Sequence, residues 1–175
     1  EMFENPAANL EVQGQSEVNV SQAVLLRALG NGVHVHTQRI TPDSPSVSLS
    51  DVLIADTQPA PKAGATAPDL ARLGVGLLVT HSVLSDTSPS PLTLRLERTL
   101  LTHNHGVGLA ARGRSVSLNA TDTRITHTQH TDNTYPFGIG IFWTAGALST
   151  ATLTRVALTH NIGIGLYSSS GELSL

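Results

Sequence analysis

The chain has 175 residues, of which 39% are hydrophobic, 13% charged and only 3% aromatic. This composition is too apolar for a disordered chain, yet it contains no apolar run long enough for a membrane span. The net charge of −3 argues against a general nucleic-acid binder, and the absence of cysteine excludes disulfides and zinc–thiolate sites.

The first predicted element is an isolated alternating segment at residues 10–12, and a complete unit follows it. This unit contains apolar alternation at residues 18–20, a second segment at 23–25 and a third at 32–35. Alternation with a period of two is typical of strands that have one buried face. We therefore expect three short strands in each unit, called a, b and c.

Residues 21–30 have an alternative interpretation as a short helix. Ser21 would be its N-cap, and Gly30 would follow its last turn. The match to the spacing of strands a and b favours a strand.

The same three-segment pattern recurs along the rest of the chain. The step from strand a to strand b is always short, as in Val20-Ala23-Leu25, Leu49-Val52-Ile54, Leu96-Thr99-Leu101 and Leu153-Val156-Leu158. A further copy, from Leu118 through Thr121 to Ile125, fits only with two extra residues. Four insertions rich in loop-forming residues separate the segments, at residues 39–45, 57–72, 85–91 and 130–136. A solenoid tolerates insertions at its corners, because successive units still stack.

Two near-identical stretches carry a family resemblance. Leu101–Leu109 reads LTHNHGVGL, and Leu158–Leu166 reads LTHNIGIGL. This motif resembles the repeat of right-handed parallel β-helix proteins of the pectin-lyase-like superfamily. The resemblance implies an all-β solenoid of three-strand coils, with about five complete coils over residues 10–175, in a single domain spanning residues 1–175.

Both ends of the repeat region read as incomplete units. Residues 10–12 form a lone strand c, and residues 173–175 form a lone strand a. Solenoids need polar caps at both ends, so we expect a fragment whose partners include neighbouring coils of a longer chain.

Strand c lies between the two variable corners, and in related enzymes this strand forms the floor of the polysaccharide cleft. If Val107 and Leu109 point inward, alternation turns the intervening glycine outward. The expected ligand-binding residues are therefore Gly108, Gly140, Phe142, Trp143, Gly165 and Tyr167. Phe142 and Tyr167 would stack about 4.8 Å apart on adjacent coils. In the alternative, the loop at residues 135–137 folds over these two rings as a satellite hydrophobic cluster.

Three histidines occupy the same repeat position, at the end of strand b. His103, His127 and His160 would stack on successive coils. They have three interpretations: a structural column, general acid–base groups beside the cleft, or ligands of a transition metal. The third lacks a carboxylate partner, so no metal site is assigned.

The sequence shows no catalytic constellation. Lyases of the resembled superfamily combine calcium-binding aspartates with a basic residue, and its hydrolases place several aspartates on the cleft strand. Neither arrangement is present, so enzymatic activity within this segment is not supported. A lyase, epimerase or glycoside hydrolase activity stays open for coils of a longer chain. No cofactor is assigned; the resemblance alone allows calcium, for which no site is identified.

The sequence favours a polysaccharide-binding or polysaccharide-processing region of a secreted or cell-surface protein. Residues 92–165 carry six arginines and three acidic residues, so an anionic glycan also stays open. The alternatives are a non-catalytic structural or adhesin-type stalk and a histidine-rich metal-binding surface. We expect no nucleic-acid partner and no membrane span.

Overall fold

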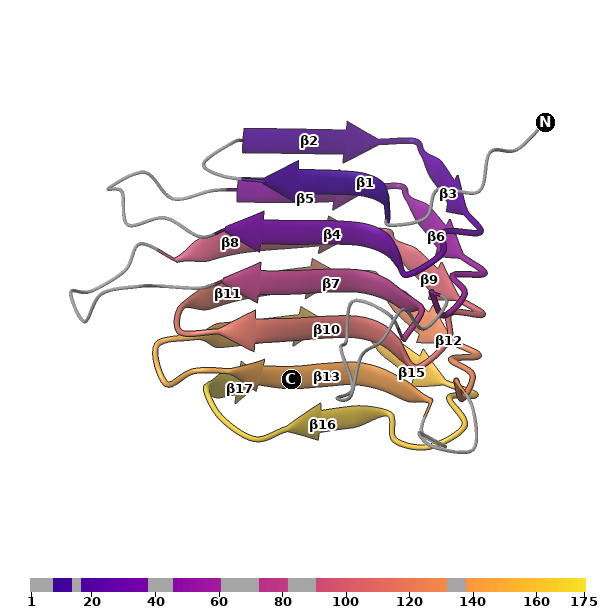
Figure 1. The fold of residues 1–175 in the computed structure, drawn as a ribbon. Helices are drawn as coiled ribbons and strands as arrows, with labels where there is room; N and C mark the ends of the chain where they lie inside the picture. The colour runs from indigo at the N-terminus through magenta and orange to yellow at the C-terminus, as the bar shows by residue number, and fades with distance from the viewer. Residues whose placement is uncertain (1–7, 14–16, 38–45, 61–72, 82–90, 132–137) are drawn as a thin grey trace.

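The computed structural model describes residues 8–13, 17–37, 46–60, 73–81, 91–131 and 138–175. Those residues form 17 strands and no α-helix, and the chain visits three parallel sheets in cyclic order (Figure 1). The sheets hold six, six and five strands, so the chain completes between five and six coils. The predicted all-β fold of three-strand coils is confirmed. None of the described segments is a helix that could cross a membrane.

Each predicted strand type occupies its own sheet. Sheet A, formed by the c strands, contains β1 (Ala8–Gln13), β4 (Asn31–Thr37), β7 (Val75–His81), β10 (Val107–Gly113), β13 (Ile139–Ala145) and β16 (Leu166–Ser168). Sheet B, formed by the a strands, contains β2 (Glu17–Ser21), β5 (Ser46–Ser50), β8 (Leu92–Glu97), β11 (Val116–Thr121), β14 (Thr150–Thr154) and β17 (Glu172–Ser174). Sheet C, formed by the b strands, contains β3 (Val24–Leu26), β6 (Leu53–Ala55), β9 (Leu100–Thr102), β12 (Arg124–Thr126) and β15 (Ala157–Thr159). The two lone strands expected near the ends are β1 and β17.

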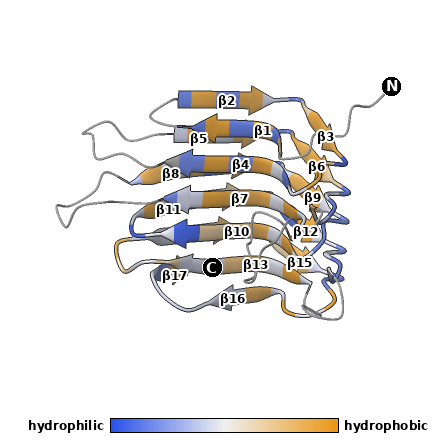
Figure 2. Ribbon diagram, in the orientation of Figure 1, coloured by the Kyte–Doolittle hydropathy of each residue, from blue (hydrophilic) through white to orange (hydrophobic). Residues whose placement is uncertain are grey.

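The interior consists of columns of aliphatic side chains that run across the coils. In sheet C the parallel register stacks Leu25, Ile54, Leu101, Ile125 and Leu158. These side chains join one core cluster with the inward residues of sheets A and B. In Figure 2, β3 is mostly hydrophobic, whereas β1, β2 and β4 also carry hydrophilic stretches. Stacking buries the apolar stripe that a single coil could not bury alone.

The corner between sheets B and C contains two residues in every coil. Its first residue has a positive φ each time, at Gln22, Asp51, Arg98, Asp122 and Arg155. This left-handed conformation is unfavourable for residues other than glycine. The neighbouring coil compensates with a backbone bond, as from Arg98 N to the Thr121 carbonyl at 3.1 Å.

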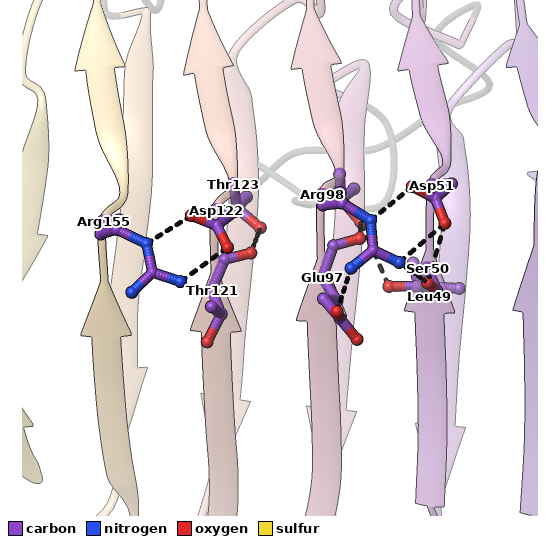
Figure 3. A network of polar contacts seen from close by, with 10 residues as sticks. Leu49, Ser50, Asp51, Glu97, Arg98, Thr121, Asp122, Thr123 and Arg155 are labelled. Atoms are coloured by element: carbon purple, nitrogen blue, oxygen red, sulfur yellow. Dashed lines mark hydrogen bonds and ion pairs between the residues drawn. The ribbon is translucent and has the colours of Figure 1, made fainter.

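Opposite charges alternate along this corner. Arg98 donates to both carboxylate oxygens of Asp51, from Nε at 2.7 Å and Nη2 at 2.9 Å, and it also pairs with Glu97. Arg155 holds Asp122 in the same way, at 2.5 and 2.7 Å (Figure 3). These hydrogen bonds lower the pKa of Asp51 and of Asp122 below the ordinary aspartate value.

The structure excludes one alternative and corrects one predicted spacing. Residues 21–30 contain β3 and turns, so the helical alternative is excluded. In the copy predicted to need two extra residues, the common spacing starts at Ala120 of β11, which pairs with Leu96. Ala120, Thr123 and Ile125 then follow the common spacing without an insertion, because alanine takes the place of the larger aliphatic residue. The four predicted insertions lie largely outside the described residues.

Candidate functional site

The outer face of sheet A presents two rows of side chains, fixed by the parallel register. The first outer row contains Glu11, His34, Leu78, Ala110, Phe142 and Tyr167, one from each strand. The second outer row contains Gln13, His36, Thr80, Arg112 and Thr144. Adjacent strands lie about 4.8 Å apart, so each row repeats a side chain at that interval. The second row is polar throughout.

Phe142 and Tyr167 form the predicted aromatic pair. Their ring centroids lie 5.1 Å apart, with 13° between the ring planes. Tyr167 is 40% exposed and Phe142 is half-buried, so part of the pair is open to solvent. The two rings sit at one end of the first outer row.

The glycines do not form the predicted outward trough. A side chain on Gly108 would point at Ile125 in the interior, and one on Gly140 would meet Asn161. Gly165 lies beside Leu158, also on the interior side. The alternation shifts at the start of the strand, because Val107 faces outward and both Gly108 and Leu109 face inward. The prediction of an outward glycine at these three positions is wrong.

Trp143 also lies away from the outer face. Its side chain is fully buried in the core cluster, and its neighbours in the register are Ala111 and Ser168. Phe142 points outward, so alternation turns the next residue inward. Trp143 therefore does not present its ring on the outer face.

A second hydrophobic cluster occupies the middle of this face. We call it the outer cluster, and it contains buried Val75, Leu78, Val107 and Ala110 with partly buried Leu73, Ile139 and Phe142. It resembles the satellite cluster considered from the sequence, although residues 135–137 lie outside the described part of the chain. Outside the outer cluster the face presents the polar second row, Tyr167 and the β1–β4 end.

Titratable groups gather at the β1–β4 end of the face. Thr80 Oγ1 lies 2.7 Å from His36 Nδ1 and 3.4 Å from His34 Nε2. The other nitrogen of His34, Nδ1, lies 4.0 Å from a carboxylate oxygen of Glu11. Arg112 is exposed and pairs in register with Thr80. The sequence alone did not indicate this group, because insertions separate its strands in the chain.

His103, His127 and His160 form the predicted histidine column on the corner between sheets C and A. Both pairs of adjacent rings have centroids 4.9 Å apart, with interplanar angles of 8° and 3°. All three residues have positive φ, and threonine hydroxyls contact Nδ1 of His103 at 2.9 Å and of His127 at 3.0 Å. Among the described residues, no carboxylate pairs with these rings. The geometry supports a stacking role.

The central ring of the column has a pKa below the ordinary histidine value. Desolvation lowers the pKa of His127, and the neighbouring His103 and His160 lower it further. Desolvation also lowers the pKa values of His81 and His105. Protonation of one ring in a stack disfavours protonation of the next.

Asparagine side chains next to the column form hydrogen bonds between adjacent coils. Asn104 accepts from the backbone N–H of Thr57 at 3.3 Å and donates to the Ile54 carbonyl at 3.3 Å. Asn161 makes the equivalent bonds to Thr128 and Ile125, at 3.1 and 3.3 Å. These bonds fix the corners that precede β10 and β16.

Within the described ranges, no three histidine, aspartate or glutamate side chains are arranged to hold a metal ion. Comparison with known proteins finds no matching family model, no matching curated protein and no matching solved structure. Function must therefore be argued from the geometry of the outer face.

Proposed function

We propose that this chain is a polysaccharide-binding region, with the glycan lying across the coils on the outer face of sheet A. The observation that carries the proposal is the stacked and partly exposed pair Phe142–Tyr167 beside a continuous polar row. Aromatic faces pack against the apolar faces of sugar rings, and polar side chains hydrogen-bond sugar hydroxyls. A row that repeats at every coil suits a polymer that repeats along its length.

The pectin-lyase-like resemblance supports the same proposal. It suggests a carbohydrate-active β-helix that is secreted or exposed at a cell surface. Arg112, together with the histidines of the face, also suits an anionic glycan, whose charge a guanidinium recognises well.

The test is retention on immobilised glycans and on a glycan array. Tyr167→Ala and Phe142→Ala should each weaken binding by about two- to tenfold, from the ~0.5–1.5 kcal/mol of an aromatic contact. Val24→Ala is the matched control, because Val24 is 62% exposed on sheet C, away from this face. Unchanged retention in both aromatic variants would reject the face as the binding site.

A non-catalytic spacer or adhesin-type stalk is the second candidate. The regularity of the coils favours it, because the same two-residue corner and the same stacked columns recur from coil to coil. A stalk predicts no glycan retention by the unmodified protein, and the array therefore separates the two candidates.

A further inference from the structure

The β1–β4 end of the outer face brings a hydroxyl, two imidazoles, a carboxylate and a guanidinium onto four adjacent strands. Thr80 on β7 stands between His36 on β4 and Arg112 on β10 in the second outer row. His34 and Glu11 are neighbours in the first outer row, on β4 and β1. Rigid strands hold all five side chains, and such elements position a site more closely than loops do.

Thr80, His34 and Glu11 lie one after another, with His34 between the hydroxyl and the carboxylate. Thr80 Oγ1 lies 3.4 Å from His34 Nε2, and His34 Nδ1 lies 4.0 Å from Glu11 Oε1. A carboxylate beside Nδ1 favours the tautomer that carries its proton there, which leaves Nε2 as an acceptor for the threonine hydroxyl. His36 Nδ1 lies 2.7 Å from the same oxygen, and the hydroxyl also donates to the Val35 carbonyl at 3.5 Å. The relay therefore requires His36 to donate to Thr80 Oγ1 and the hydroxyl to turn from Val35 to His34.

We propose that Thr80, His34 and Glu11 form a nucleophile–base–carboxylate relay that hydrolyses carboxylic esters, with Arg112 facing the oxyanion. The order hydroxyl, imidazole, carboxylate is the one that activates a weak nucleophile, and its distances are commonly longer before substrate binds. The natural substrate that we propose, an ester substituent on a glycan, rests on the proposed function. The relay itself does not depend on glycan binding.

Water is the only co-reactant that the hydrolysis requires. Thr80 Oγ1 attacks the ester carbonyl carbon while its proton passes to His34 Nε2, and the guanidinium of Arg112 stabilises the resulting oxyanion. The bond to the alkoxy oxygen then breaks, and that oxygen takes the proton from His34 and leaves as the alcohol. Water attacks the acyl-Thr80 ester, giving its proton to His34. Thr80 recovers its proton as the carboxylic acid is released.

The accessibility of the group fits this role. The side chain of His34 is 19% exposed and that of Glu11 is 44% exposed, while Arg112 is exposed. The base is thus partly shielded from water, whereas the guanidinium is open to an approaching carbonyl. Partial shielding strengthens the interaction between a charge and a developing oxyanion.

The experiment uses p-nitrophenyl acetate and follows p-nitrophenolate release, with mass spectrometry to locate any acetyl group. The relay predicts acetylation on Thr80 and loss of this product in Thr80→Ala, with recovery in Thr80→Ser. His34→Ala and Arg112→Ala should each slow release by about 100-fold or more. Thr152→Ala, on the exposed face of sheet B, should match the unmodified protein.

Two results would overturn the relay. One is acetylation confined to histidine side chains, which react with activated esters on their own. The other is an unchanged release rate in both Thr80→Ala and His34→Ala. Because the small ester needs no glycan, acetylation of Thr80 supports the relay whatever the array shows. If Thr80 is not acetylated, the relay is rejected, even if Tyr167→Ala weakens glycan retention.

Discussion

At Gly108 the interior of the coil leaves no room for a side chain. A Cβ at this position would collide with the Cγ2 atom of Ile125 and approach the Gly140 carbonyl to 2.8 Å. The φ angle of Gly108 is not in the left-handed region, so space alone selects glycine here. This requirement explains why the motif repeats glycine at a position that faces the interior.

We expect Gly108→Ala to lower the free energy of unfolding by about 1–3 kcal/mol, the usual cost of overpacking a core. Gly165→Ala is the matched control, since its nearest neighbour, Leu158 Cβ, lies at an ordinary 3.8 Å. Urea denaturation measures both variants. Equal losses of unfolding free energy in the two variants would show that backbone conformation, and not the lack of space for a side chain, requires glycine at position 108.

At the scale of the structural elements, the histidine column contributes to a dependence of folding stability on pH. His127 has a lowered pKa in the folded protein, as do His81 and His105. An unfolded chain binds protons at these residues with the ordinary pKa of about 6.5, so it gains protons before the folded chain does. Stability is therefore fully present above that pH and declines as the pH falls toward the lowered pKa values.

Replacing the central ring should flatten this decline. His127→Asn removes one group with a lowered pKa, and asparagine tolerates the positive φ of 54° at this corner. The melting temperature of this variant should fall less steeply than that of the unmodified protein between about pH 7 and about pH 5. Parallel curves for the two proteins would assign the pH dependence to His81 and His105 instead.

Over the whole molecule, local repeats were predictable and long-range neighbours were not. The corner spacing and the equivalence of His127 with His103 and His160 follow from short stretches that the sequence repeats. The direction of Gly108 depends on Ile125, a neighbour that packing reveals and alternation does not. The residues around Thr80 lie on strands that long insertions separate in the sequence. The pairing register of those strands could therefore not be predicted from sequence spacing.

A solenoid in which each coil packs on the coils beside it should make the cost of a core substitution depend on its position in the stack. Leu101 is fully buried and lies in register between Ile54 and Ile125, whereas Leu158 is half-buried on β15, the last strand of sheet C. Leu101→Ala should cost about 2–5 kcal/mol of unfolding free energy, and Leu158→Ala roughly half as much.

Urea denaturation at equilibrium measures this difference. The exposed Leu148, at 60%, is the control, and Leu148→Ala should stay within about 0.5 kcal/mol of the unmodified protein. A cost at Leu158 that equals the cost at Leu101 would mean that the last coil is as tightly packed as the middle ones. The stability of the solenoid would then not be a sum over neighbouring coils. A half-buried Leu158 makes fewer contacts than Leu101, so those contacts alone could not account for an equal cost.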